Sequence, residues 1–263
     1  MIKETFDLWE NVSGMSDAAP WITVYVPEIK RTEGALVVLP GGGYGGLSPS
    51  EGNDYAEFFA DKGITVFVCG YRVAPHKFPA QLLDSRRAVK FARYYAEKYG
   101  LDKNKIYIMG SSAGGHLAAL TSTYYKEIEV DKPDEIDKEN FVPNGQILCY
   151  PVIKLLGKGI AHFGSGINLL GENLAEYGEE LSPDLIAEEG TPKAFIWHTF
   201  EDDCVNVINS LEYARRLRNV GTETELHIFP KGGHGMGLAE SSPHVAQWKQ
   251  LLINWLEYNG FFK

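Results

Sequence analysis

The sequence is poor in several features that mark particular classes of protein. Its 263 residues include only three cysteines, Cys69, Cys149 and Cys204, whose spacing fits no metal site. Lys and Arg number 25 against 35 Asp and Glu, a net charge of -10. Tight binding to nucleic acid or to an anionic membrane depends on clustered basic residues. We therefore expect no metal, no nucleic-acid partner and no membrane partner.

Long apolar runs and targeting signals are also missing from the sequence. No apolar run approaches the roughly 20 residues of a membrane-spanning helix. Residues 1–7 lack the basic, apolar and small-residue regions of a signal peptide, and the few cysteines do not require an oxidising compartment. A cytoplasmic location is the simplest expectation, unless the sequence is a processed, mature form.

What the sequence does contain is an alternation of short apolar runs with helical stretches. Apolar residues recur at helical spacing in residues 88–99 and 245–256, and several runs are too uniformly apolar to have a solvated face. The pattern predicts one α/β domain over residues 1–263. It has a mostly parallel sheet of about eight strands, helices on both faces and a short cap insertion at 154–190. The runs are 21–26, 35–39, 64–69, 105–109, 146–150, 194–198 and 225–229.

The strongest local pattern is a serine between glycines at a predicted strand-to-helix junction. Residues 110–114 read Gly-Ser-Ser-Ala-Gly. In a G-x-S-x-G turn the central serine exposes its hydroxyl as a nucleophile, so the spacing selects Ser112. Such a turn also directs the N–H of Ala113 towards the position where negative charge develops on a substrate oxygen. A bare match can equally be an inert glycine-rich turn, so its context decides.

A second glycine-rich tract provides that context. Residues 40–46 read Pro-Gly-Gly-Gly-Tyr-Gly-Gly and follow the run 35–39, where a hydrolase with this motif places further oxyanion donors. A phosphate loop is excluded, because no correctly spaced Gly-Lys-Ser/Thr follows. We expect the N–H groups of Gly42 and Gly43 to form an oxyanion hole with that of Ala113.

His234 is the candidate general base. It lies between glycines in residues 231–237, after the last predicted strand and before the last predicted helix. Its place suits the chain order nucleophile, acid, histidine. The histidines that follow Ser112 and lie outside the candidate site are expected to be packed or solvated; they are His116, His198, His227 and His244.

The acid is expected after the run 194–198, where three carboxylates are adjacent. They belong to Glu201, Asp202 and Asp203. One of them should orient His234, while a run of acidic residues is also typical of a solvated loop. Spacing alone does not choose among the three.

Together these motifs resemble the esterase branch of the α/β-hydrolases, above all acetyl-xylan and acetyl/feruloyl esterases. In that family the acid loop commonly reads D-x-x-V-P, which matches from Asp202 to Val205 with Asn206 in place of proline. The resemblance therefore implies Asp202 as the acid, and no metal or organic cofactor. One departure is Pro40, where related enzymes often have histidine. The resemblance rests on residues 40–44, 71–75, 110–118, 150–153 and 232–235.

The resemblance implies a serine-dependent carboxylic ester hydrolase that acts through an acyl-enzyme. Its expected substrate is a small-molecule or oligosaccharide ester, and its expected leaving acyl group is short, most of all acetyl, on a carbohydrate such as xylan. Tyr44, Ser111 and His162 are expected to contact that substrate. The alternatives are an arylformamidase-like or peptidase-like amide hydrolase and, from another class, a non-catalytic binding module on the same fold. Homo-oligomerisation is left open.

Overall fold

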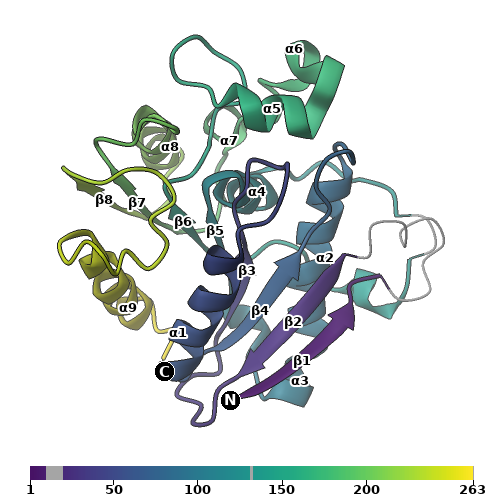
Figure 1. Ribbon diagram of the computed structural model, residues 1–263. Coiled ribbons are helices and arrows are strands. Elements are labelled where there is room, and N and C mark those ends of the chain that lie inside the picture. The colour runs from purple at the N-terminus through teal and green to yellow at the C-terminus, as the bar shows by residue number, and fades with distance from the viewer. Residues whose placement is uncertain (10–19, 131–132, 263) are drawn as a thin grey trace.

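The computed structural model describes residues 1–9, 20–130 and 133–262, and an eight-stranded sheet forms its centre (Figure 1). The strand order is β1-β2-β4-β3-β5-β6-β7-β8. β1 pairs antiparallel with β2, and β2 with β4, while every later pair is parallel. The strands are β1 (Ile2–Asp7), β2 (Trp21–Val26), β3 (Ala35–Leu39), β4 (Thr65–Gly70), β5 (Ile106–Ser111), β6 (Gly145–Cys149), β7 (Ala194–Thr199) and β8 (Thr224–Phe229).

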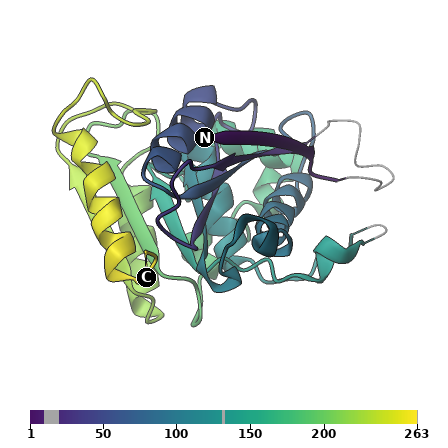
Figure 2. The ribbon, with the colours of Figure 1, turned by 90° about the horizontal axis from the view of Figure 1, so that it is seen from below.

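The seven apolar runs correspond to β2 through β8, with ends that differ by at most two residues. β1 was not among them. It is an edge strand whose residues are exposed or half-buried, and only Ile2 and Phe6 in it are apolar. A strand that covers little of the core needs no apolar run, and sequence periodicity therefore does not reveal it. Figure 2 shows this edge, beside the N-terminus, at the far end of the sheet from β8.

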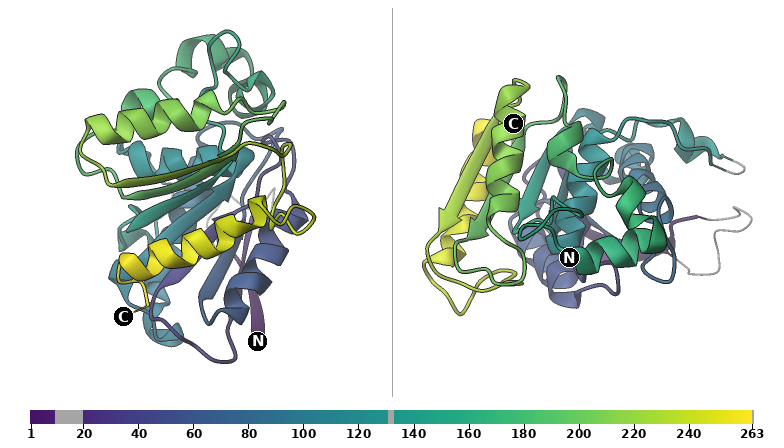
Figure 3. Two further views of the ribbon diagram at one scale, coloured as in Figure 1. Left: turned by 90° about the vertical axis from the view of Figure 1, so that its left-hand side faces the viewer. Right: turned by 90° about the horizontal axis from the view of Figure 1, so that it is seen from above.

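Helices cover both faces of the sheet, as predicted. Side chains of α2, α4 and α8 belong to one buried core and those of α1 and α9 to the other, and Figure 3 shows α8 and α9 on opposite sides of the strands. Alternate residues of a strand feed alternate cores: Val37 packs in the first core and Val38 in the second. The helices are α1 (Tyr55–Asp61), α2 (Ala80–Tyr94), α3 (Ala96–Tyr99), α4 (Ser112–Thr123), α5 (Phe163–Leu170), α6 (Leu174–Tyr177), α7 (Pro183–Ile186), α8 (Ile208–Asn219) and α9 (Trp248–Tyr258).

The first predicted helix begins earlier than its apolar spacing indicated. α2 starts at Ala80 rather than near residue 88, and its first half buries charged side chains. Asp84 is fully buried and accepts hydrogen bonds from the Arg72 guanidinium at 2.7 and 2.9 Å. Because the buried residues in this part of the helix are charged and paired, the periodicity of apolar residues does not reveal them.

The parallel strands β3 to β8 end at one edge of the sheet, and residues 154–190, the predicted cap insertion, follow β6 at that edge. Residues 154–190 contain α5, α6 and α7, and Figure 1 shows α5 and α6 above α4. Loops from the ends of parallel strands converge at such an edge, which is where open α/β sheets place their ligands. Within the described parts of the chain, no helix is long and apolar enough to cross a bilayer.

Candidate active site

Ser112 occupies the sharp turn between β5 and α4. Its backbone is in the left-handed region, with φ 53°, a conformation that costs a non-glycine residue about 1–3 kcal/mol. Two close backbone contacts make the turn possible. A Cβ at Gly110 would lie 2.1 Å from the Gly114 carbonyl oxygen, and one at Gly114 would lie 2.1 Å from the Leu39 carbonyl oxygen. The two glycines are therefore required by packing, and they let the turn present Ser112 at the end of the sheet.

His234 joins Ser112 to Asp202. The Ser112 Oγ and His234 Nε2 atoms are 2.8 Å apart, and His234 Nδ1 lies 2.7 Å from Asp202 Oδ2. With a proton on Nδ1 that is donated to the carboxylate, Nε2 is free to accept the serine proton. The structure thus brings together three residues that lie 90 and 32 positions apart in the sequence, in the geometry of a nucleophile, a base and an orienting acid.

The Asp202 carboxylate accepts hydrogen bonds at both oxygens. Oδ1 accepts the N–H groups of Cys204 and Val205 at 3.0 and 2.8 Å, and Oδ2 accepts from His234 and from His198, the latter at 3.1 Å. Burial alone would raise the pKa of Asp202. The hydrogen bonds from His198, His234 and Val205 outweigh it and hold that pKa well below its usual range. The carboxylate is therefore ionised at neutral pH, as an orienting acid must be.

His198 is a contact of the acid that the sequence did not reveal. It was expected to be a packed strand residue and is fully buried. Its Nε2, however, lies 3.1 Å from Asp202 Oδ2 and 2.9 Å from the Val205 carbonyl oxygen, while the Ser210 hydroxyl lies 2.8 Å from Nδ1. The available signal was its position near the end of β7, four residues before the acid.

The other two carboxylates of the acid loop point elsewhere. Glu201 forms an ion pair with Lys231 at the surface, and Asp203 is exposed. Neither is hydrogen-bonded to His234 in the described residues. Of the three, Asp202 is thus the carboxylate in hydrogen-bond contact with His234. Of the remaining histidines, His227 contacts Glu225 at 2.7 Å, and His244 is exposed.

The oxyanion loop, residues 40–46, is held by its carbonyl groups. The Tyr71 hydroxyl donates to the Pro40 carbonyl at 2.6 Å, and the Asn168 amide donates to the Gly43 carbonyl at 2.9 Å. In the described residues, no protein acceptor takes the N–H of Gly42 or Gly43. The N–H of Ala113 is also available, because the first turn of a helix has no intrahelical acceptors. These three N–H groups thus remain open to a ligand oxygen.

The loop lies directly against the nucleophile. A Cβ at Gly41 would lie 3.0 Å from the Ser112 Cβ, and Gly42 and Gly43 both have positive φ, 131° and 64°. At Gly42 a Cβ would also lie 2.3 Å from the Gly46 carbonyl oxygen. Glycine is thus required at this loop for both its conformation and its close packing.

The structure places two of the expected substrate contacts in the interior of the protein. Tyr44 and Ser111 are both fully buried. The Tyr44 hydroxyl lies 2.7 Å from His116 Nδ1, and the Ser111 hydroxyl donates to the Tyr55 hydroxyl at 3.1 Å. Side chains next to the two motifs in the sequence therefore point into the protein interior and support the loops instead of facing a substrate.

His162 lies near the site but has other contacts. It is half-buried, with Nδ1 2.8 Å from the Ser165 hydroxyl and Nε2 3.7 Å from the Cys204 sulfur. Burial is the main cause of a lowered pKa at His162; nearby His234 lowers it further and Asp202 opposes the decrease. A role for His162 in substrate contact stays a prediction.

Comparisons with known proteins identify the family to which this chain is similar. The family model described as BD-FAE matches residues 22–217. An acetylxylan esterase of Xylanibacter ruminicola is 32% identical over 247 residues, which cover 92% of this chain and 48% of that protein. The endo-1,4-beta-xylanase B of Butyrivibrio fibrisolvens is 36% identical over 221 residues, covering 81% of this chain and 33% of that protein. The chain thus spans about a third to a half of the length of these curated relatives.

Among solved structures, the crystal structure of an acetyl ester-xyloside bifunctional hydrolase from Caldicellulosiruptor lactoaceticus superposes with a TM-score of 0.91 at 37% identity. The match covers 98% of this chain and 97% of that one. The strand order and this near-complete overlap show that the fold is the α/β-hydrolase fold. On its fold, its motifs and the extent of the family match, the chain belongs to the BD-FAE family.

Proposed function

We propose that this chain is a serine-dependent carboxylic ester hydrolase that removes short acyl groups, most of all acetyl, from a carbohydrate such as xylan or an acetylated oligosaccharide. The observation that carries the proposal is the pair of hydrogen bonds that join Ser112, His234 and Asp202. Ser112 Oγ lies 2.8 Å from His234 Nε2, and His234 Nδ1 lies 2.7 Å from Asp202 Oδ2. The names of two similar proteins, an acetylxylan esterase and an acetyl ester-xyloside hydrolase, support the acetyl and carbohydrate parts.

The reaction would proceed in two acyl-transfer steps. His234 takes the proton of Ser112 as its oxygen attacks the ester carbonyl, and the carbonyl oxygen becomes an oxyanion within reach of the N–H groups of Gly42, Gly43 and Ala113. His234 then returns the proton to the departing alcohol, which leaves an acyl-enzyme. Water, activated by the same imidazole, releases the acid and restores the serine.

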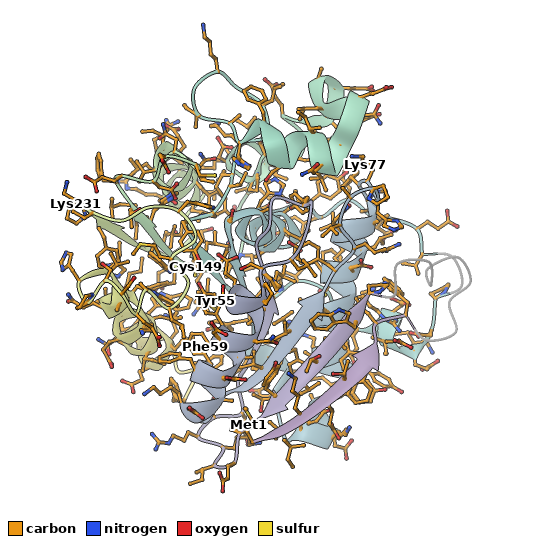
Figure 4. All side chains as sticks on the ribbon, in the orientation of Figure 1. Met1, Tyr55, Phe59, Lys77, Cys149 and Lys231 are labelled. Carbon is orange, nitrogen blue, oxygen red and sulfur yellow. The ribbon has the colours of Figure 1, made fainter. Side chains whose placement is uncertain are left out.

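The preference for a short acyl group is supported by the small cap. Its helices are short, with eight residues in α5 and four each in α6 and α7, and the sequence contains no long apolar segment suited to a lipid tail. α5 also begins next to His162, which we propose to contact the alcohol part of the substrate. The C-terminal turn of α5 is fixed by Lys77, which donates to the Ile167 and Asn168 carbonyls at 3.0 and 2.9 Å (Figure 4).

The proposal is tested by active-site labelling together with an acetate-release screen. A fluorophosphonate probe is expected to label the native protein and not the Ser112→Ala variant. Acetylated xylo-oligosaccharides and p-nitrophenyl acetate are expected to be hydrolysed faster than long-chain p-nitrophenyl esters, feruloyl esters and N-formylkynurenine. A native protein that is not labelled would overturn the hydrolase assignment. Faster cleavage of N-formylkynurenine than of the acetyl esters would show that the protein is an amide hydrolase and not an ester hydrolase.

A further inference from the structure

A second buried carboxylate lies beside the triad, and the reaction described above does not use it. Glu51, in the helical turn Ser50–Asp54 before α1, is only 4% exposed. Its Oε2 accepts the Gly41 N–H at 2.8 Å, and its Oε1 accepts the Tyr150 hydroxyl at 2.7 Å. No Lys or Arg forms an ion pair with it in the described residues. A buried carboxylate without a cation is costly unless its hydrogen bonds are well formed.

The Gly41 contact connects Glu51 to the oxyanion loop. A Cβ at Gly41 would lie 2.4 Å from Glu51 Oε2 and 3.0 Å from the Ser112 Cβ, so only glycine fits between the carboxylate and the nucleophile. The peptide group between Pro40 and Gly41 is held at both ends, since the Pro40 carbonyl accepts the Tyr71 hydroxyl. The orientation of this peptide group sets the direction of the residues that follow, Gly42 and Gly43.

The Tyr150 contact connects Glu51 to the loop of the base. The Tyr150 hydroxyl accepts the Gly237 N–H at 2.9 Å, three residues after His234. The Tyr150 ring packs edge-on against the His234 imidazole, with centroids 5.2 Å apart and an angle of 73°. The Tyr55 hydroxyl, in the interior on α1 (Figure 4), lies 3.3 Å from that of Tyr150. Tyr150 therefore contacts both the ring and the backbone of the base loop.

We propose that Glu51 is a positioning residue that couples the two halves of the active site, through Gly41 to the oxyanion loop and through Tyr150 to the loop of His234. The inference rests on the proposed function. A carboxylate only accepts hydrogen bonds, so it requires two donors, and here each donor lies on a different loop. Hydrogen bonds to a charged acceptor in a low-dielectric interior are strong. One side chain thus fixes the position of the oxyanion-loop N–H groups relative to His234 while charge develops on the substrate.

The two hydrogen bonds at Glu51 act against the effect of its burial. Burial raises the pKa of Glu51, while the hydrogen bonds from Tyr150 and from the Gly41 N–H oppose the increase. Both donors therefore stabilise the ionised form, which is the form that can accept from two loops at once.

The test uses Glu51→Gln, which keeps the size of the side chain. An amide has one acceptor oxygen, and its NH₂ group cannot accept, so one of the two loops loses its link. We expect kcat on p-nitrophenyl acetate to fall about 10- to 100-fold, less than the 10²- to 10³-fold of a lost oxyanion donor, with KM changed less than threefold. Tyr150→Phe removes only the link to the base loop and should lower kcat about tenfold.

Three controls make the result specific. Glu57→Gln, at an exposed carboxylate on α1, should leave kcat unchanged. The double variant of Glu51→Gln with Tyr150→Phe should lose less activity than the product of the two single losses, because both changes break the same connection. Fluorophosphonate labelling of folded variants should slow in parallel with kcat.

The outcomes separate this inference from the proposed function. If the native protein is neither labelled nor active, the proposed function fails. If it is active and kcat of Glu51→Gln stays within twofold of native, the positioning role of Glu51 is overturned. If Glu51→Gln does not fold, Tyr150→Phe decides, and an unchanged kcat in that variant overturns the coupling of the two loops.

Discussion

Each half of the active site rests on a buried histidine, and the two histidines have different partners. On the oxyanion side, His116 Nδ1 accepts the Tyr44 hydroxyl at 2.7 Å, and its Nε2 donates to the Leu181 carbonyl at 2.8 Å. On the acid–base side, the Nε2 of His198 lies 3.1 Å from the ionised Asp202. Burial lowers the pKa of His116 to about 4, although the Leu181 contact opposes the decrease.

The difference shows two uses of a buried imidazole. His116 remains neutral and links the oxyanion loop, through Tyr44, to the residues that precede α7. His198 instead adds a donor to a carboxylate that is required to stay charged, because His234 becomes positive during the proposed reaction. Substitutions on the acid–base side and in the oxyanion loop should therefore change kcat, while substitution of His116 should change the pH dependence of stability.

The largest effect is expected on the acid–base side. Asp202→Asn should lower kcat about 10⁴-fold. The new amide can donate to His234 Nδ1, which favours the tautomer with its proton on Nε2. In that tautomer Nε2 cannot accept the proton of Ser112. The measurement is initial-rate kinetics on p-nitrophenyl acetate. Asp203→Asn, at the exposed neighbour, is the matched control and should retain native activity. A loss below tenfold for Asp202→Asn would show that another carboxylate orients the base.

The next largest effect is expected in the oxyanion loop. Gly42→Ala should lower kcat about 10²- to 10³-fold, because the new Cβ would lie 2.3 Å from the Gly46 carbonyl oxygen and the loop must move. Gly43→Ala is the matched control. Its φ is 64° with no heavy atom within 4 Å of the added Cβ, so it should cost only about 1–2 kcal/mol of stability and a few-fold in kcat. Equal losses of kcat in the two variants would contradict the close packing at Gly42.

The neutral state of His116 predicts a pH dependence of stability. Below about pH 6.5 the unfolded chain protonates this histidine, whereas the folded chain does not until about pH 4. The unfolded state then holds more protons, so stability falls as the pH decreases through this window, by about 3 kcal/mol in total. Urea unfolding from pH 7 to pH 4 measures the slope. His116→Gln should be less stable at pH 7 and should show a smaller slope; an unchanged slope would assign the acid sensitivity to other groups.

The parts of the site that sequence could predict are those encoded within a few residues. Gly110 and Gly114 are required by backbone contacts around one turn, and the central strands are apolar because both of their faces are covered. The same reasoning did not foresee that Tyr44 and Ser111 are buried, because residues adjacent to a motif need not share its orientation. The support of the site escaped prediction altogether. Glu51 and Tyr150 are 99 residues apart, and neither lies in a recognisable pattern.

The smallest effect, and the sharpest test of the comparison between the two histidines, is expected from His198→Phe. Phenylalanine keeps an aromatic ring, although a larger one, and has no N–H group, so Asp202 loses one of its donors and retains the N–H groups of Cys204 and Val205 and the His234 contact. The pKa of Asp202 should rise while staying below its usual range, and kcat should fall about tenfold, which initial rates measured across pH would show. His227→Phe, on the neighbouring strand β8, is the matched control and should retain native kcat. An unchanged kcat in folded His198→Phe would show that three donors suffice for Asp202, and that His198 does not act through the charge of this carboxylate.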